Sequence, residues 1–386
     1  MQATRAIVHL DRFLVNLRAV RERAGPQRHI CVPVKADAYG HGAPAIARAS
    51  AAAGAWLGVA RVEEGAALRK EGINAPILLF SQPLFEEIPE IIENQLIPLV
   101  SDGEFAAKLD QAAGAAAVRL PVHLKIDTGM GRMGCPPGEA PAVAGKIAAC
   151  AALEYAGTAT HLAVADSAAP EDIAYTERQI ACFNEALEAI RAAGLNPGIV
   201  HAANSGAVIL HPGAWFDMVR PGIILYGYKA VEETDRKLPP LRVEPVMELR
   251  TNVVMIKQVK KGETISYGRT WSAPQDTELA VLPIGYADGL PRLASNKWQV
   301  IIGGAPYPLA GRVCMDQCMA DLGPASGVRR WDEAVIFGGS APSAAELAER
   351  VGTIPYEITC NISKRVPRIV TNGENPALRL ETKTQK

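Results

Sequence analysis

A lysine between an apolar segment and a glycine-rich turn is the first residue in this chain that could do covalent chemistry. Lys35 ends the apolar segment that begins at Ile30, and Tyr39, Gly40 and Gly42 follow closely. The segment predicts a buried strand, and a lysine at a strand end under a tight turn can lose its hydration. Desolvation lowers the pKa of the amine and makes it a nucleophile, as Schiff-base chemistry requires. The same lysine could also extend into water at a strand edge, so its residue type alone leaves both interpretations open.

Polar side chains follow later apolar segments in the same way. They are Lys125, Asp127 and Arg132 in one glycine-rich stretch, then His161, then His201, Asn204 and Ser205, then Arg220 and Gly222. Together with free backbone amides, such side chains could hold a phosphate group and an aromatic cofactor. Each also has an ordinary structural interpretation. Asn204 and Ser205 can cap a helix. His161 can be a hydrogen-bonded core residue, and Arg132 can lie on the surface.

The segments that would position these residues alternate between short apolar strands and alanine-rich helices. This alternation indicates a parallel sheet, and eight such units fit a (β/α)8 barrel whose active groups lie at the carboxyl ends of the strands. We therefore predict an α/β fold with an N-terminal TIM-type barrel over residues 1–237. The expected strands are 30–35, 56–60, 77–80, 96–100, 122–127, 154–161, 199–204 and 218–226.

A second, mostly-β domain is predicted for residues 238–386. The segment 238–241 (Leu-Pro-Pro-Leu) indicates a linker, and alternating strand patterns with glycine-bearing turns follow it. One helix is expected, at 343–351, and residues 1–10 could pair with this domain instead of the barrel. The expected strands are 246–259, 278–284, 298–302, 312–320 and 333–337.

Composition excludes several classes of protein. The 386 residues are 48% hydrophobic with a net charge of −1, which gives no electrostatic basis for binding nucleic acid or anionic membranes. No apolar segment reaches transmembrane length, and the N-terminus lacks the apolar core of a signal peptide. The seven cysteines form no disulfide framework, and Cys314 and Cys318 have no second pair at zinc spacing, so no metal site is expected. We expect a cytoplasmic location.

The stretch 32–42 (VPVKADAYGHG) resembles the cofactor-lysine signature of the alanine racemases, pyridoxal-phosphate enzymes that interconvert L- and D-alanine. Further blocks resemble the same family in the same order, which is more specific than any single motif. The departures are a looser 161–167 segment and a missing tyrosine in 365–370. The matching blocks are 124–132, 201–206, 220–227, 265–271, 285–289, 311–316 and 355–358.

The resemblance implies a role for each matching residue. Lys35 would bind pyridoxal 5'-phosphate covalently and act as one acid/base, while Tyr267 would act on the opposite face. Tyr267 and Met315 would come from the partner subunit of a homodimer. The other implied roles are phosphate and cofactor binding by Tyr39, Asn204, Ser205, Gly222, Ile223 and Tyr356; pyridine-nitrogen and ring contacts by Arg220 and His161; substrate-carboxylate binding by Arg132 and Met315; carbamylation of Lys125; and substrate entry past Asp166, Tyr286, Arg292 and Arg312.

These roles agree with the chemistry of racemisation, which removes a proton from one face of Cα and adds one to the other. The implied product is D-alanine for peptidoglycan. The alternatives are a broad-spectrum, serine or lysine racemase of the same fold, and a barrel protein that carries pyridoxal phosphate. Such a carrier lacks a second domain, whereas this chain has one that contains Tyr267 and Met315.

Overall fold

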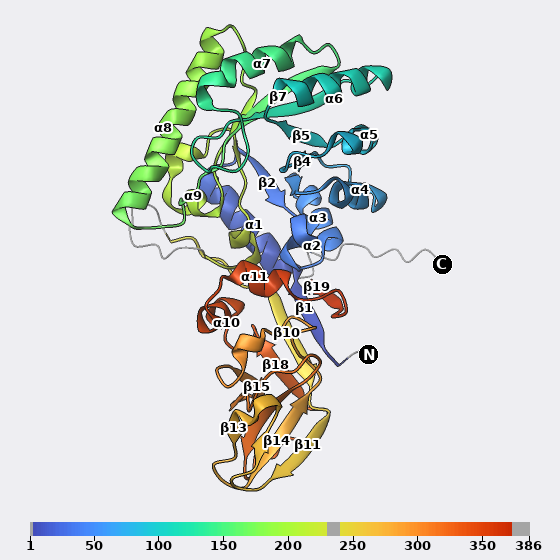
Figure 1. Cartoon of the computed structure of the whole chain (residues 1–386), viewed down its shortest axis with the longest axis vertical. Helices are drawn as coiled ribbons and strands as arrows, with labels where there is room; N and C mark the ends of the chain where they lie inside the picture. The colour runs from blue at the N-terminus through green and yellow to red at the C-terminus, as the bar shows by residue number, and fades with distance from the viewer. Residues whose placement is uncertain (1–2, 230–239, 373–386) are drawn as a thin grey trace. The chain divides into compact units, whose positions relative to one another are not determined.

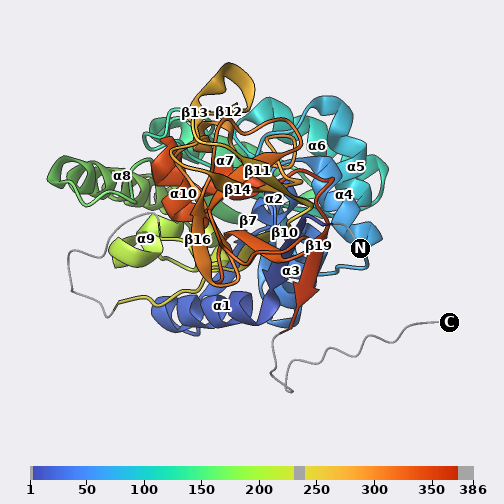
Figure 2. The ribbon, with the colours of Figure 1, turned by 90° about the horizontal axis from the view of Figure 1, so that it is seen from below.

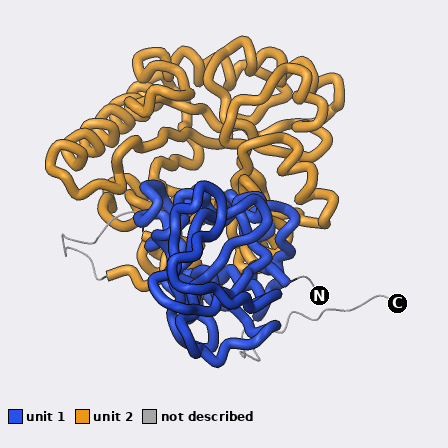
Figure 3. Tube along the Cα trace, turned by 60° about the horizontal axis from the view of Figure 1, so that its bottom comes forward, with its two compact units in different colours: residues 1–13, 39–42, 244–386 blue, residues 14–38, 43–243 orange. Residues whose placement is uncertain are grey.

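The computed structural model describes residues 3–229 and 240–372 in two compact units (Figure 3). Unit 1 gathers residues 1–13, 39–42 and 244–386, and unit 2 gathers residues 14–38 and 43–243. Of the predicted linker 238–241, residues 238 and 239 lie outside the described residues. Among the helices that are described, none combines the length and apolar content needed to cross a bilayer.

Unit 2 is a closed barrel of eight parallel strands, as predicted. Its core includes Cys31, Leu78, Ile97 and Met218, which come from four different strands. Helices alternate with the strands, and α4, α5 and α6 follow one another along the outside of the barrel (Figure 1, Figure 2). The strands are β2 (His29–Pro33), β3 (Trp56–Val59), β4 (Ile77–Leu79), β5 (Ile97–Val100), β6 (Leu120–Lys125), β7 (Leu153–Ala159), β8 (Ile199–His201) and β9 (Met218–Val219).

The barrel helices follow from apolar spacing and from capping residues at their ends. In α6, the Asp102 side chain accepts a hydrogen bond from the Phe105 amide, while Phe105 and Leu109 are buried one turn apart. The helices are α1 (Leu10–Ala24), α3 (Ala43–Ala52), α4 (Val62–Lys70), α5 (Ile88–Glu93), α6 (Gly103–Ala115), α7 (Ala140–Ala149), α8 (Pro170–Ala192) and α9 (Ser205–Leu210).

Unit 1 contains three sheets. A six-stranded sheet has the order β16-β15-β18-β10-β1-β19, and smaller sheets pair β11-β14-β17 and β12-β13. The N-terminal strand β1 runs antiparallel to β10 and parallel to β19. The strands are β1 (Arg5–His9), β10 (Met247–Asn252), β11 (Met255–Val259), β12 (Thr264–Ile265), β13 (Trp271–Ser272), β14 (Thr277–Leu282), β15 (Gln299–Ile302), β16 (Ala305–Pro308), β17 (Cys318–Gly323), β18 (Glu333–Phe337) and β19 (Arg368–Thr371).

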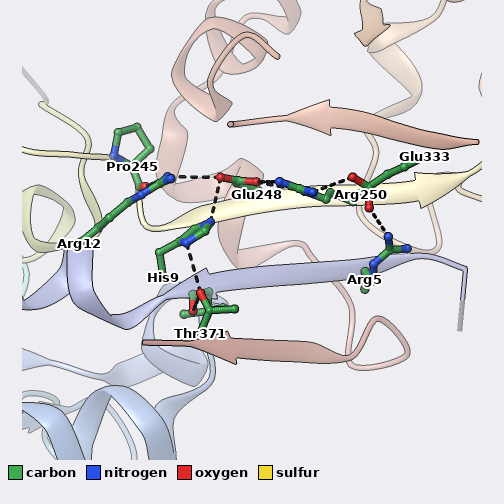
Figure 4. Close-up of polar contacts among 9 residues, drawn as sticks. Arg5, His9, Arg12, Pro245, Glu248, Arg250, Glu333 and Thr371 are labelled. Atoms are coloured by element: carbon green, nitrogen blue, oxygen red, sulfur yellow. Dashed lines mark hydrogen bonds and ion pairs between the residues drawn. The ribbon is translucent and has the colours of Figure 1, made fainter. Parts of the chain in front are cut away.

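A charged network crosses the six-stranded sheet, as Figure 4 shows. The nearly buried carboxylate of Glu248 lies 2.8 Å from His9 Nε2 and 3.3 Å from an Arg12 nitrogen, and it also pairs with Arg250. Arg250 continues to Glu333 at 2.6 Å. The hydrogen bond from His9 lowers the pKa of Glu248 to about 2, with Arg250 assisting against the effect of burial. The network therefore fixes β1 to β10 within unit 1.

Four expectations about secondary structure were wrong. The strand expected at 246–259 is two strands, β10 and β11, which belong to different sheets. The strand expected at 218–226 is only β9, because Pro221 has no amide hydrogen and a 3-10 turn (Ile223–Tyr226) follows Gly222. The strand expected at 312–320 begins only at Cys318, and the preceding residues form a loop. A second helix, α11 (Pro355–Cys360), follows the predicted helix α10 (Ala344–Val351). It is too short to produce a helical pattern in the sequence.

Candidate active site

Lys35 begins a turn with unusual backbone geometry. β2 ends at Pro33, and the Val34 amide still donates to the Gly58 carbonyl at 2.8 Å. The element α2 (Lys35–Tyr39) then contains consecutive left-handed residues, with φ of 52°, 54°, 53° and 54° at Ala36, Asp37, Ala38 and Tyr39. Each such residue costs roughly 1–2 kcal/mol when it carries a Cβ. Lys35 therefore leaves the barrel strand at the start of a strained turn, where functional residues are often placed.

The end of this turn contacts α11 within unit 1. Gly40 has φ +82°, and a Cβ at this position would lie 2.0 Å from the Thr359 carbonyl oxygen, so only glycine fits. The guanidinium of Arg368 donates to the Gly40 carbonyl at 2.9 Å. The rings of Tyr39 and Tyr356 lie 5.7 Å apart, centre to centre. Two of the tyrosines expected at the phosphate are thus neighbours.

Arg220 follows β9 and is buried inside the barrel unit, with 8% of its surface exposed. It donates to His201 Nδ1 at 2.6 Å and to the Thr160 and Ala202 carbonyls at 2.7 and 3.1 Å. A weaker contact of 3.3 Å joins it to His161 Nδ1. Burial lowers the pKa of Arg220 to about 10, which leaves the group charged at neutral pH.

The partners of this arginine are neutral. Burial first, and the charge of Arg220 second, hold the pKa of His161 and of His201 well below the usual range. Because a guanidinium only donates, His201 must accept at Nδ1 and carry its proton on Nε2. His201 Nε2 then donates to His123 Nδ1 at 2.7 Å. The described hydrogen-bond partners of Arg220 are two histidines and two backbone carbonyls, and none is a carboxylate.

This donor set fits the pyridine nitrogen of pyridoxal phosphate. A buried cation without a carboxylate partner is costly, and a further acceptor in the site would satisfy it. Arg220 cannot give up its proton readily at neutral pH, so it would hold the ring nitrogen by donating without protonating it. An acidic residue here would instead favour a protonated ring.

The residues predicted to bind the cofactor phosphate also have suitable hydrogen-bonding groups. Ser205 Oγ accepts from the Gly222 amide at 2.8 Å and from the Ile224 amide at 3.4 Å, so its own proton can be donated elsewhere. Asn204 caps α9 by accepting from the Ala207 amide at 3.1 Å. The structural interpretation of Asn204 is therefore correct. Ser205, next to it in the chain, is oriented toward the Gly222 turn.

A second cation, Lys125, lies at the end of β6 next to the Asp127–Arg132 turn. Its Nζ donates to the carbonyls of Ile126 at 2.8 Å and Met133 at 3.2 Å. Burial, with Arg220 assisting, lowers the pKa of Lys125 to about 8. Asp127 Oδ1 accepts from the Gly129 and Gly131 amides and shapes the turn that carries Arg132, whose side chain is exposed. Asp166 is exposed as well.

Several predicted residues of unit 1 lie in segments that contact one loop, 312–316. Ser266, beside Tyr267, donates to the Arg312 carbonyl at 2.6 Å. Gly285, beside Tyr286, packs so closely that a Cβ there would lie 2.3 Å from the Met315 carbonyl oxygen. The Val313 amide donates at 2.9 Å to Ser295, which follows the turn (Arg292–Ala294). Tyr267, Tyr286 and Met315 are 69%, 43% and 53% exposed.

Comparison with known proteins identifies the family. The family model for the alanine racemase N-terminal domain matches residues 8–230, and the model for the C-terminal domain matches residues 246–370. This chain belongs to the alanine racemase family. Alanine racemases of Treponema denticola and Treponema pallidum are 48% and 43% identical to it, each over 96% of this chain and 98% and 99% of theirs.

Solved structures agree with this family assignment. The alanine racemase of Clostridium difficile has a TM-score of 0.90 at 34% identity and covers 96% of this chain and 97% of that one. That of Streptomyces coelicolor has a TM-score of 0.88 at 38% identity over 96% and 98%. The alanine racemase fold, a TIM-type barrel followed by a mostly-β domain, is therefore confirmed.

Two residues that contact the predicted site residues or their turn were missed in the sequence. His123 lies two positions before Lys125 on β6, and residues two apart on a strand share a face, so strand alternation could have placed both in the barrel interior. Glu64 contacts the lysine turn from α4, and no local pattern predicts a contact between segments so far apart in the chain.

Proposed function

We propose that this chain racemises alanine with pyridoxal 5'-phosphate and supplies D-alanine for peptidoglycan. The observation that carries the proposal is Arg220, a buried guanidinium whose described partners are all neutral acceptors. Bound pyridoxal phosphate would supply an electron-withdrawing ring system that makes the Cα proton of the amino acid more acidic. The residues of the chain then bind, orient and exchange protons with the substrate.

We propose that residues at both ends of the cofactor hold it. Lys35 would bind it covalently, Arg220 would donate to its ring nitrogen, and His161 would pack beside the ring. Its phosphate would accept from the Ser205 hydroxyl, whose lone pairs are already used by backbone amides. The remaining phosphate contacts would come from Tyr39, Gly222, Ile223 and Tyr356, with Asn204 supporting Ser205.

Two bases would act on opposite faces of the substrate. Lys35 takes the proton from one face of Cα, and Tyr267 provides or accepts the proton on the other. Tyrosine is a poor base at its ordinary pKa, so it needs a cation nearby. A Cβ at Gly268, the residue after Tyr267, would lie 2.8 Å from the Arg312 guanidinium, so Arg312 packs against the turn that carries Tyr267.

We propose a homodimer in which Tyr267 and Met315 act on the barrel of the partner subunit. Both side chains are more than half exposed, which is unusual for groups that must exclude water during catalysis. Burial against a second copy would resolve this. Asp166, Tyr286, Arg292 and Arg312 would then line the route by which the substrate enters.

The substrate carboxylate would be held by Arg132 and by the Met315 amide. The lowered pKa of Lys125 leaves a substantial neutral fraction at mildly alkaline pH, and a neutral amine can attack carbon dioxide. The nitrogen forms a bond to the carbon, one proton leaves, and a carbamate anion results. That anion would orient Arg132. The seven free cysteines are typical of a reducing compartment, which supports a cytoplasmic location.

The test is NMR of the purified holoenzyme in heavy water with L-alanine, L-serine and L-lysine in turn. We expect Cα exchange with inversion for alanine and far slower reaction of the other two. Comparable rates with serine or lysine would indicate the broad-spectrum racemase instead. A protein that binds pyridoxal phosphate covalently but exchanges no Cα proton would be a carrier, and the proposal would fail.

A further inference from the structure

The turn after Lys35 requires an explanation for its stability. Four consecutive residues with a Cβ adopt left-handed geometry, at a combined cost on the order of several kcal/mol. Ala36 and Asp37 are exposed, so burial of their side chains does not offset this cost. Inside the turn, the Ala38 amide donates to the Val34 carbonyl at 2.8 Å, with the i to i−4 spacing of a helical bond. Contacts from outside the turn must therefore contribute.

One contact from outside the turn is made by Glu64, the third residue of α4. Its Oε1 accepts from the Ala36 amide at 2.7 Å. Its Oε2 accepts from the Ala60 amide at 2.8 Å and the Arg61 amide at 3.2 Å. One carboxylate thus joins the turn after β2 to the connection after β3, within unit 2.

The Oε2 bonds have an ordinary explanation, because a glutamate at the third helical position commonly accepts from backbone amides at the start of its helix, here those of Ala60 and the N-cap residue Arg61. The Oε1 bond is not part of that motif. The amide that it holds belongs to the peptide group between Lys35 and Ala36, immediately after the lysine Cα. Fixing the plane of this peptide fixes the direction in which the Lys35 side chain leaves the backbone.

We propose that Glu64 is a positioning residue that holds the left-handed turn and thereby aims the amine of Lys35. The inference rests on the proposed role of Lys35 in racemisation. Asp37 supports the other end of the turn, where its Oδ1 accepts from the Ala43 amide at 2.8 Å. That bond is short-range and leaves the peptide of Lys35 untouched, so Glu64 carries the positioning role.

The experiment compares Glu64→Ala with Glu63→Ala in the holoenzyme. Glu63 is the neighbouring glutamate; its side chain is 62% exposed and pairs with the Arg61 side chain at 3.3 Å. We expect Glu64→Ala to lower kcat/KM on the order of tenfold, since small misplacements of a reacting group have effects of this size or larger. The pH dependence of the visible absorbance of the resting holoenzyme should shift as well. Glu63→Ala should match wild type in both measurements.

Isotope effects separate positioning from simple loss of structure. The substrates are L- and D-alanine with deuterium at Cα. In Glu64→Ala, the isotope effect on kcat/KM should rise for the enantiomer that gives its proton to Lys35 and fall for the other. A role limited to capping α4 would lower the melting temperature and leave both isotope effects and the absorbance profile unchanged, which would overturn the proposal.

Two further variants keep the test decisive if Glu64→Ala folds poorly. Glu64→Gln retains one oxygen acceptor but faces an amide hydrogen with its NH2 group, so it should show an intermediate loss. Ala36→Gly in the Glu64→Ala background removes the Cβ cost of the left-handed turn and should return part of the lost rate. If Ala36→Gly restores none of the lost rate, the effect of Glu64 on Lys35 does not pass through the left-handed turn. Inactive wild-type protein would instead refute the proposed function.

Discussion

The barrel residues of the site and the unit 1 residues of the site differ in how completely their own unit surrounds them. Arg220 is 8% exposed and makes four polar contacts within the barrel unit, and Lys125 is 5% exposed. Tyr267 and Met315 are 69% and 53% exposed on loops of unit 1. The first group is preorganised by its own unit, whereas the second is presented outward. On the proposed function, the buried barrel residues would bind the cofactor, and the exposed residues of unit 1 would close the site over the substrate.

The largest effect on racemisation is expected from Tyr267→Phe, because this substitution removes one base and leaves the predicted site residues of the barrel unchanged. Racemisation should fall by about 10²–10⁴-fold. Because Lys35 remains, one enantiomer should still exchange its Cα proton with heavy water without inversion, while the other should not. NMR of both enantiomers in heavy water measures this. Loss of exchange for both enantiomers alike would contradict the assignment of one base to each region.

The control for this variant is Tyr307→Phe, on β16 of the same unit. It has no role in the proposed site and should retain wild-type exchange and inversion with both enantiomers.

The next prediction tests whether the predicted site residues of the barrel require carbamylation of Lys125. With labelled bicarbonate, wild type should show a carbamate carbon signal by NMR that Lys125→Ala lacks. Because the pKa is lowered to about 8, the neutral amine and hence the signal should increase as pH rises through that value. Lys125→Ala should lower kcat/KM on the order of tenfold through a less ordered Arg132. Lys108→Ala, an exposed lysine on α6, is the control, and equal signals in both variants would exclude the carbamate.

The smallest effect on activity, and a clear effect on stability, is expected from Glu248. Its pKa is lowered from 4.5 to about 2 in the folded chain, so its ionised form adds stability above pH 4.5. That contribution, roughly 3 kcal/mol, is lost as pH falls from 4.5 through 2. Glu248→Gln should therefore lower the urea midpoint at pH 7 and flatten the loss of stability in acid. The 62% exposed Glu244 supplies the control, Glu244→Gln, and identical acid profiles would contradict the network's role.

The sequence predicted the site residues of the barrel better than it predicted the turn and the side chains that contact them. Lys35, Lys125 and Arg220 each follow an apolar segment, and strand alternation with helices places such ends at one face of a barrel. The left-handed turn could not be predicted, because alanine and aspartate give no signal for four positive φ angles in succession. The contact of Glu64 with this turn depends on the closed barrel.

The unit 1 loops were harder to predict for a different reason. The loop before Cys318 contains the apolar run Val313, Cys314 and Met315, which favoured a strand, but Gly285 packs against the backbone of this run. The roles of Tyr267 and Met315 came from family resemblance, because exposed residues on irregular loops have no periodic pattern. The domain division at residue 237 and the trans arrangement stay predictions.

Subunit complementation tests the central claim most directly, namely that the two bases come from different regions and meet across a dimer. Lys35→Ala and Tyr267→Phe proteins are each expected to be inactive in racemisation. Refolded together, they should form hybrid dimers in which one site has both Lys35 and Tyr267, and alanine racemisation should reappear. If mixed protein stays as inactive as each variant alone while mass analysis shows hybrid dimers, both bases act within one chain and the account is wrong.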